Sequence, residues 1–320
     1  MSRLLRAGLI RVASLGTTLL IVSVLIFLIT YLIPGDPSMT LLGTEVSDEA
    51  RAALRVQLGL DEPLIVRYGI WLAHVLGGDL GTSIFGQFPV TELILRALPV
   101  SAELMVFTVL IALAIAIPAA MIAATGRDRW SGAATLMGTY VGLSVPPFWL
   151  ALMFIYAFAV HLAWLPASGF VRAEDSLVGN LRAMVLPSVT LGLVYSTGLA
   201  RFLRAGLLDV LSEDYVRTAR MKGVSERMVL LRHVLKNAMI PFITVLGLEM
   251  GWLLGGTVLI ENVFALPGMG RLALNAILQR DYSLVQGVAL VMALLFVLIN
   301  LTVDALYAVL DPRIRVGARA

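Results

Sequence analysis

The sequence predicts an all-α integral membrane protein with six transmembrane helices. Of its 320 residues, 59% are hydrophobic and only 14% are charged, whereas soluble domains contain about 25% charged residues. Six apolar runs are close to or above the roughly 20 residues that cross the hydrocarbon core as a helix. None shows the strict alternation of polar and apolar residues typical of transmembrane β-strands. The runs are residues 12–33, 104–125, 131–160, 183–200, 237–260 and 282–303, and only Glu249 interrupts them with a charge.

The positions of lysine and arginine predict the orientation of these helices. The net charge of +3 is small, but most of the 24 lysines and arginines fall in four segments that would share one side of the membrane. Cytoplasmic loops carry an excess of these residues. We therefore expect cytoplasmic N- and C-termini and a cytoplasmic position for the charged stretch 212–237. The four segments are residues 1–11, 126–130, 201–236 and 313–320.

The first apolar run is expected to persist as a helix and not to be removed as a signal peptide. Its apolar part exceeds the usual length of about 7–15 residues, and a Pro-Gly-Asp-Pro sequence at residues 34–37 follows it in place of a small-residue cleavage site. The outer segment that follows, to about Val100, is predicted to contain short helices at residues 50–58 and 64–76. The apolar face of the second consists of Ile65, Tyr68, Leu72 and Val75.

The chain is predicted to have three divisions. Residues 1–100 hold the first helix and a long extracytoplasmic loop. Residues 101–312 hold a core of five membrane helices and include a cytoplasmic loop at residues 205–237. Residues 313–320 form a short basic tail.

Two prolines interrupt the third apolar run. Pro146 and Pro147 stand near its middle, and a regular helix cannot accommodate such a pair. Breaks of this kind are accepted in membranes where the freed backbone groups face protein or a watery cavity. The pair is therefore interpreted either as a static kink or as a moving part of a pathway.

Glu249 is the one carboxyl group in the middle of an apolar run. An ionised group there costs at least about 2.5–3.5 kcal/mol, so we expect it to face protein or water. It is either part of a polar pathway, with Trp252 as a second candidate, or a structural hydrogen-bonding group. It points nearly opposite to a stripe of small residues that would let another helix approach closely. The stripe consists of Gly247, Gly251 and Gly255.

The charged stretch 212–237 is predicted to form two short helices around a turn. Gly223 ends the first helix, where a left-handed residue is needed. Ser225 is the expected cap of the second helix, with Met228, Leu231 and Leu235 facing inward. From this pattern alone, the stretch is either a rigid knob that another protein can push or pull, or an ordinary charged connector.

The first of these helices resembles the signature loop of ATP-binding-cassette (ABC) importer permeases. The matching residues read Thr218-Ala219-Arg220-x2-Gly223, in place of the broad Glu-Ala-Ala-x3-Gly consensus. Residues 214–223 and 232–238 are more similar to the dipeptide, oligopeptide and nickel branch of that family. Eight further short segments match this branch in order, although Asn262 stands where threonine is commoner. They are residues 33–37, 58–63, 78–83, 89–92, 144–149, 164–169, 261–270 and 310–313.

The resemblance implies the type I ABC importer permease fold and the role of first permease subunit in a bacterial cytoplasmic membrane. Such a subunit forms half of a translocation pathway for dipeptides, oligopeptides or related small solutes. Its partners are a second permease subunit, two cytoplasmic ATPase subunits that bind ATP and magnesium, and an extracytoplasmic solute-binding protein. The residues implied to couple the permease to the ATPase are Asp214, Tyr215, Arg217, Thr218, Ala219, Arg220, Lys222 and Gly223.

Other functions find little support in the residues. The only lysines are Lys222 and Lys236, and neither follows a glycine, so no phosphate-binding Gly-x4-Gly-Lys-Ser/Thr loop exists in the chain. We therefore expect a non-catalytic subunit that holds no cofactor, metal or nucleic acid. The alternative is an ion-coupled secondary transporter, which would need more intramembrane ionisable residues and often inverted repeats. A membrane enzyme would need paired carboxylates or a histidine cluster within the spans.

Overall fold

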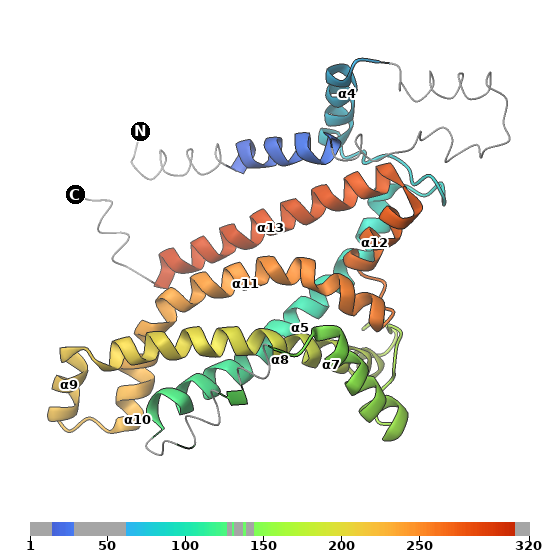
Figure 1. The fold of residues 1–320 in the computed structure, drawn as a ribbon. Helices are drawn as coiled ribbons and strands as arrows, with labels where there is room; N and C mark the ends of the chain where they lie inside the picture. Colours follow the sequence, from blue (N-terminus) through green and yellow to red (C-terminus); the bar gives the residue numbers. More distant parts are fainter. Residues whose placement is uncertain (1–14, 29–61, 127–129, 131–136, 139–143, 311–320) are drawn as a thin grey trace, which may run out of the picture. The chain divides into compact units, whose positions relative to one another are not determined.

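The computed structural model describes residues 15–28, 62–126, 130, 137–138 and 144–310, with backbone alone for 304–310. Within these ranges the regular structure is helical, apart from one isolated bridge between Thr82 and Pro89. Besides Leu15–Leu28, the elements are α4 (Leu64–Leu76), α5 (Val90–Thr125), α7 (Pro147–Phe154), the π-helix η1 (Ile155–His161), α8 (Leu177–Leu211), α9 (Asp214–Met221), α10 (Glu226–Met228), the π-helix η2 (Val229–Leu235), α11 (Lys236–Val263), α12 (Met269–Gln279) and α13 (Tyr282–Leu310) (Figure 1).

Four helices of the described residues are long and apolar enough to cross a membrane. They are α5, α8, the continuous stretch Glu226–Val263 and α13. Leu15–Leu28 and Pro147–His161 are shorter apolar helices that fall within the first and third predicted spans. An all-helical membrane protein is thus confirmed. The count of six spans stays a prediction, and the predicted helix 50–58, residues 34–37 and the tail 313–320 lie outside the described residues.

The described residues fall into two compact units. The first comprises the described residues up to 100 and residues 267–297, and the second comprises the described residues from 101 to 266 and from 298 to 310. Each unit takes part of α5 and part of α13, because both helices continue from one unit into the other. The three divisions predicted from the sequence stay a prediction.

In the first unit, α4 lies against the helix Leu15–Leu28. Its bounds match the predicted helix. The rings of Tyr68 and Trp71 lie 5.5 and 5.8 Å from that of Phe27, and the Tyr68 hydroxyl lies 2.8 Å from Ser23 Oγ. Ile65, expected on the same face, is 80% exposed. The contact face is therefore centred on two aromatic side chains three residues apart.

A second contact in this unit is organised by the buried carboxylate of Asp281. Its Oδ2 accepts hydrogen bonds from Ser83 Oγ at 2.5 Å and from the backbone N–H of Ile84 at 3.1 Å. Its Oδ1 accepts from the N–H of Leu284 at 3.2 Å. One side chain thus caps the start of α13 and holds the loop that precedes α5, because each oxygen serves a different segment.

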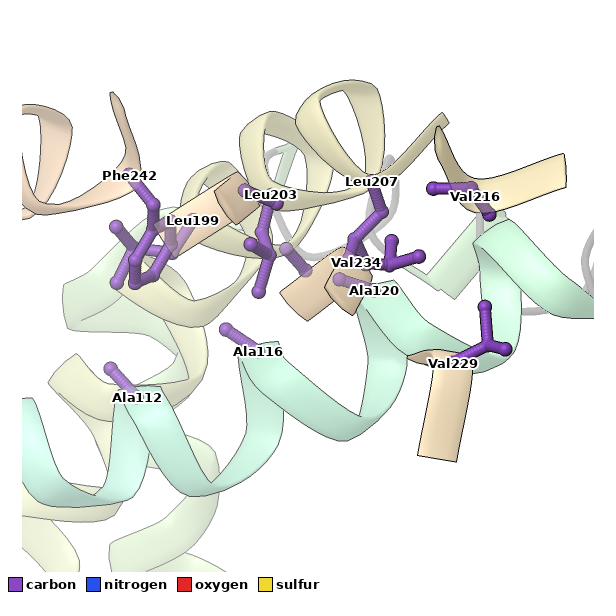
Figure 2. Packing of buried hydrophobic residues seen from close by; sticks show 12 residues of the cluster. Ala112, Ala116, Ala120, Leu199, Leu203, Leu207, Val216, Val229, Val234 and Phe242 are labelled. Carbon is purple, nitrogen blue, oxygen red and sulfur yellow. The ribbon is translucent and has the colours of Figure 1, made fainter. Parts of the chain in front are cut away.

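The second unit has its core where α5 and α8 run side by side. Ala112, Ala116 and Ala120 recur every four residues along α5 and are buried. They face a row of leucines on α8, as Figure 2 shows. Small side chains let two helices approach closely in a membrane, where packing replaces the hydrophobic driving force. The row on α8 consists of Leu199, Leu203 and Leu207.

Two further contacts bring α5 and α8 together. A Cβ added at Gly192 would lie 2.6 Å from Cγ2 of Ile111, so only glycine fits there without a shift of the neighbouring side chain. Nearer the other end, Nε of Arg204 donates a hydrogen bond of 3.1 Å to the carbonyl oxygen of Ala123, in the last turn of α5. The two helices are therefore joined by packing and by a charged donor at a helix C-terminus.

The predicted break at the double proline is confirmed. Pro146 has an extended backbone with φ −62° and ψ 134°, and Pro147 is the first residue of α7. This is the helix position where the missing proline N–H costs nothing. The helix α7 lies beside α8 and α11. Within Pro147–His161, the second half is a π-helix.

The stripe of glycines on α11 serves only in part as a packing surface. A Cβ at Gly247 would clash with the side chain of Val303 on α13, so the backbones approach closely there. Gly255, two turns further, has open space around it. The expectation that the stripe lets another helix approach closely is therefore confirmed at Gly247, while Gly255 makes no such contact within the described residues. A close contact is found instead at Gly256, where an added Cβ would lie 2.7 Å from the hydroxyl of Tyr195.

Replacing Gly247 with alanine is expected to lower stability by about 1–3 kcal/mol, because the new methyl group overpacks a stiff β-branched neighbour. The matched control is Gly255→Ala on the same helix, which is expected to be neutral or slightly stabilising since alanine favours helices by about 1 kcal/mol. Thermal unfolding of the purified protein in lipid nanodiscs measures both. Equal shifts for the two variants would contradict the close approach at Gly247.

Candidate functional site

The charged stretch forms a compact knob at one end of α8 and α11. Two residues separate the end of α8 from the start of α9, and α10 and η2 lead from α9 into α11 (Figure 1). Acidic Asp214 lies in the first turn of α9 and basic Arg220 in the last, which favours the helix dipole at both ends. The knob is defined as residues 212–237, and it is continuous with two membrane-crossing helices.

One side chain fixes α9 to the rest of the second unit. Val216 is fully buried and belongs to the same core cluster as Leu207 of α8 and Val234 of η2 (Figure 2). Ala219, one turn later, is half-buried against this cluster. The remaining predicted coupling residues are exposed, namely Asp214, Tyr215, Arg217, Thr218, Arg220, Lys222 and Gly223.

The turn after α9 has the predicted left-handed geometry. Gly223 has φ 78°, and a Cβ added there would meet no atom within 4 Å. Any cost of a larger residue therefore comes from the backbone conformation and not from a clash. Ser225 stands at the predicted cap position of α10, but within the described residues its side chain makes no capping hydrogen bond.

The inward face of the segment after the turn differs from the prediction. Met228 and Leu231 are 47% and 45% exposed, whereas Val229 and Val234 are fully buried. Leu235, the third predicted residue, is half-buried against the core cluster, so the prediction is confirmed there. The physical reason for the difference is the π-helix at Val229–Leu235. Residues five apart share a face in a π-helix, while the prediction assumed the spacing of three and four residues found in an α-helix.

Two side-chain contacts in the knob were not predicted. The guanidinium of Arg220 binds the carboxylate of Glu226 across the turn, with Nε 2.8 Å from Oε1. Asn237, in the first turn of α11, donates from Nδ2 to the hydroxyl of Tyr215 at 3.0 Å. The sequence offered only weak signals for them, since polar residues are common in any exposed connector. Both contacts link α9 to the chain that enters α11.

The intramembrane candidates lie on α11 and α7. Glu249 is half-buried, with Oε1 3.6 Å from the position that a Cβ of Gly198 on α8 would occupy. The carboxyl group of Glu249 therefore lies next to Gly198, at a distance that an added methyl group would still allow. Trp252 is 76% exposed in the isolated chain. Pro146 and Pro147 stand at the start of α7, which packs beside α11. The role of these four residues in a pathway stays a prediction.

The family models identify the class of protein. Residues 116–316 match the family described as the inner membrane component of binding-protein-dependent transport systems. Residues 4–105 match the N-terminal model for membrane components of the same systems. The chain belongs to this family, and it is accordingly a permease subunit of an ABC importer, as the resemblance of residues 214–223 to the signature loop had implied.

Curated relatives cover almost the whole chain. A putative peptide transport system permease protein of Brucella abortus is 43% identical over 305 residues, which are 95% of this chain and 97% of the relative. The glutathione transport system permease protein GsiC of Salmonella choleraesuis is 44% identical over 309 residues, with the same coverage. Among solved structures, an amino acid ABC transporter crystallised with histidines matches 70% of this chain with a TM-score of 0.49 and 17% identity.

The assignment of the buried face of η2 can be tested by two substitutions with alanine. Val234→Ala is expected to lower stability by about 2 kcal/mol, because it removes buried methyl groups and leaves a cavity. Leu231→Ala, three residues earlier and exposed, is expected to change stability by less than about 0.5 kcal/mol. Unfolding midpoints of the two purified variants are the measurement. A larger loss for Leu231→Ala would restore the α-helical interpretation.

Proposed function

We propose that this chain is one of the two permease subunits of an ATP-driven importer of peptides in a bacterial inner membrane. The support for the substrate class comes from the relatives, one named for peptide transport and one for the tripeptide glutathione. The chain would form half of the translocation pathway. A second, similar permease subunit would form the other half, and an extracytoplasmic solute-binding protein would deliver the peptide.

The observation that carries the mechanism is the position of α9. The helix exposes its charged side chains and is anchored by Val216 to the ends of two membrane-crossing helices. We propose that α9 seats in a groove of a cytoplasmic ATPase subunit, with Tyr215 to Gly223 as the contact surface. Because its anchor is buried, a displacement of α9 would act on the end of α8 and on η2, which leads into α11.

ATP and magnesium would be bound by the partner subunits. The chain contains no phosphate-binding loop, so the energy for transport must come from elsewhere. ATP binding would close the ATPase pair and turn the permease outward, and hydrolysis would reset it. In this scheme the chain is non-catalytic, and its cytoplasmic termini follow from the distribution of lysine and arginine.

For the membrane interior we keep Glu249, Trp252, Pro146 and Pro147 as pathway candidates. Glu249 lies next to Gly198 at the contact of α8 and α11. The break at Pro146 frees backbone groups of the kind found next to watery cavities. The family membership speaks against the alternative of an ion-coupled secondary transporter, since the matching models describe binding-protein-dependent systems.

The coupling role of α9 predicts that Gly223→Val uncouples transport from ATP hydrolysis. A β-branched residue resists the left-handed backbone, at a cost of about 1–2 kcal/mol, so the turn that orients α9 would relax. Solute uptake and ATP hydrolysis, measured on the reconstituted transporter, should separate, with uptake falling while hydrolysis persists. Gly223→Asn is the matched control, because asparagine enters this region readily. Uptake at the parental level in the valine variant would overturn the assignment.

The pathway role of Glu249 predicts different effects for two substitutions. Glutamine keeps the size and the hydrogen-bonding capacity of the side chain, so uptake by Glu249→Gln should fall less than about twofold. Leucine removes the polar group. Uptake by Glu249→Leu should therefore fall about tenfold or more, although the variant assembles into the transporter as the parent does. Initial rates of uptake in proteoliposomes distinguish them. Full activity of both variants would remove Glu249 from the pathway.

A further inference from the structure

Asn237 occupies the junction between the knob and the membrane helix α11. It is the second residue of α11, directly after the π-helix η2 ends at Leu235. Its Nδ2 lies 2.6 Å from the carbonyl oxygen of His233 and 3.0 Å from the hydroxyl of Tyr215. An amide nitrogen carries two hydrogens, so both are engaged, one by the backbone of η2 and one by α9.

This arrangement fixes the direction of the Asn237 side chain. The bond to His233 ties the amide to the backbone one turn earlier, where the helix changes from π to α geometry. With that hydrogen engaged, the second one is directed at Tyr215 without a free choice of rotamer. Tyr215 is the second residue of α9, so the bond joins the start of α9 to the start of α11 over 22 residues of chain.

The other links between α9 and α11 are of a different kind. The ion pair between Arg220 and Glu226 crosses the turn at Gly223 and ends on α10, not on α11. Val216 packs into the core cluster without directional bonds. The covalent path from α9 to α11 runs through η2, and π-helical turns are rare and typically mark functional sites. Among these links, the Tyr215–Asn237 hydrogen bond is the one that connects the two helices directly and with a defined direction.

We propose that Asn237 is a positioning residue that transmits the movement of α9 to the membrane helix α11 through the hydroxyl of Tyr215. The proposal rests on the function proposed above, in which α9 binds the ATPase. When the bond is present, α9 and the first turn of α11 move as one body. When it is absent, α9 remains seated and anchored by Val216, but part of its displacement is absorbed in η2.

The test is a double-mutant cycle on the complete transporter reconstituted in proteoliposomes, with solute uptake and ATP hydrolysis measured in the same vesicles. Tyr215→Phe removes the hydroxyl alone, and Asn237→Leu removes the amide at similar size. Each is expected to lower the number of solutes transported per ATP by about threefold, as for the loss of one hydrogen bond. The double variant is expected to be no worse than either single one, since both remove the same bond.

Ser212→Ala is the matched control. Its hydroxyl donates a 2.7 Å hydrogen bond to the carbonyl oxygen of Asp209 in the last turn of α8, so this bond stays within the C-terminal end of α8 and does not join α9 to α11. The transport-to-hydrolysis ratio of this variant should equal that of the parent. An unchanged ratio in Tyr215→Phe or Asn237→Leu, or effects that multiply to about ninefold in the double variant, would overturn the proposal.

A cross-linking experiment distinguishes the failure of this proposal from the failure of the proposed function on which it rests. The chain has no cysteine, so Lys222→Cys introduces a single thiol on the exposed side of the knob, and a short bifunctional reagent reports whether an ATPase subunit lies against it. Cross-linking together with an unchanged ratio in Asn237→Leu overturns only the role of Asn237. No cross-link to an ATPase subunit overturns the seating of α9 itself, and with it both proposals.

Discussion

The burial of Val216 is the interaction on which the rest of the knob depends. A charged helix as short as α9 is not stable alone, because isolated helices need about 12–15 residues to hold together in water. One fully buried valine, packed beside Leu207 and Val234, supplies the tertiary contact that the charged residues cannot supply. Because that contact is made with the ends of α8 and η2, the exposed residues of α9 acquire a fixed relation to the membrane helices.

The residues that anchor Val216 belong to a core in which α5 and α8 are closely packed. In a membrane, apolar side chains gain little from leaving lipid for another helix, so close backbone approach and polar bonds must hold helices together. The alanines of α5, the contact at Gly192 and the bond from Arg204 to Ala123 provide both. On α11 the equivalent close contact is with Val303 at Gly247. The two helices that carry the knob therefore pack against each other and each against one further neighbour, α8 against α5 and α11 against α13.

Local backbone chemistry was the part of the structure that the sequence predicted well. The left-handed Gly223, the break at Pro146 and the bounds of α4 each follow from one or two residues whose conformational limits are strong. The inward face of the segment 228–235 was predicted correctly at Leu235 but not at Met228 and Leu231. The burial of Val229 and Val234 depends on a π-helical period, which no residue type in the sequence indicates. The partner of Asn237 was missed for a related reason: a hydrogen bond across 22 residues requires the turn, the π segment and the anchor to be placed first.

The chain connects α9 to α8 by a short segment and to α11 by a long one, and this difference affects how a movement of α9 reaches each helix. Between α8 and α9 stand only Ser212 and Glu213, so a displacement of α9 relative to α8 must be taken up by a few backbone dihedrals next to a well-packed helix. Between α9 and α11 stand the Gly223 turn, α10 and η2. This connection is longer and less regular, so it can change shape more easily when α9 moves. If α9 is driven by a partner, α8 receives the motion through the chain itself. For α11 to receive the motion directly from α9, and not only through its packing against α8, a contact must connect α9 to α11 without passing through η2. Tyr215 and Asn237 make such a contact.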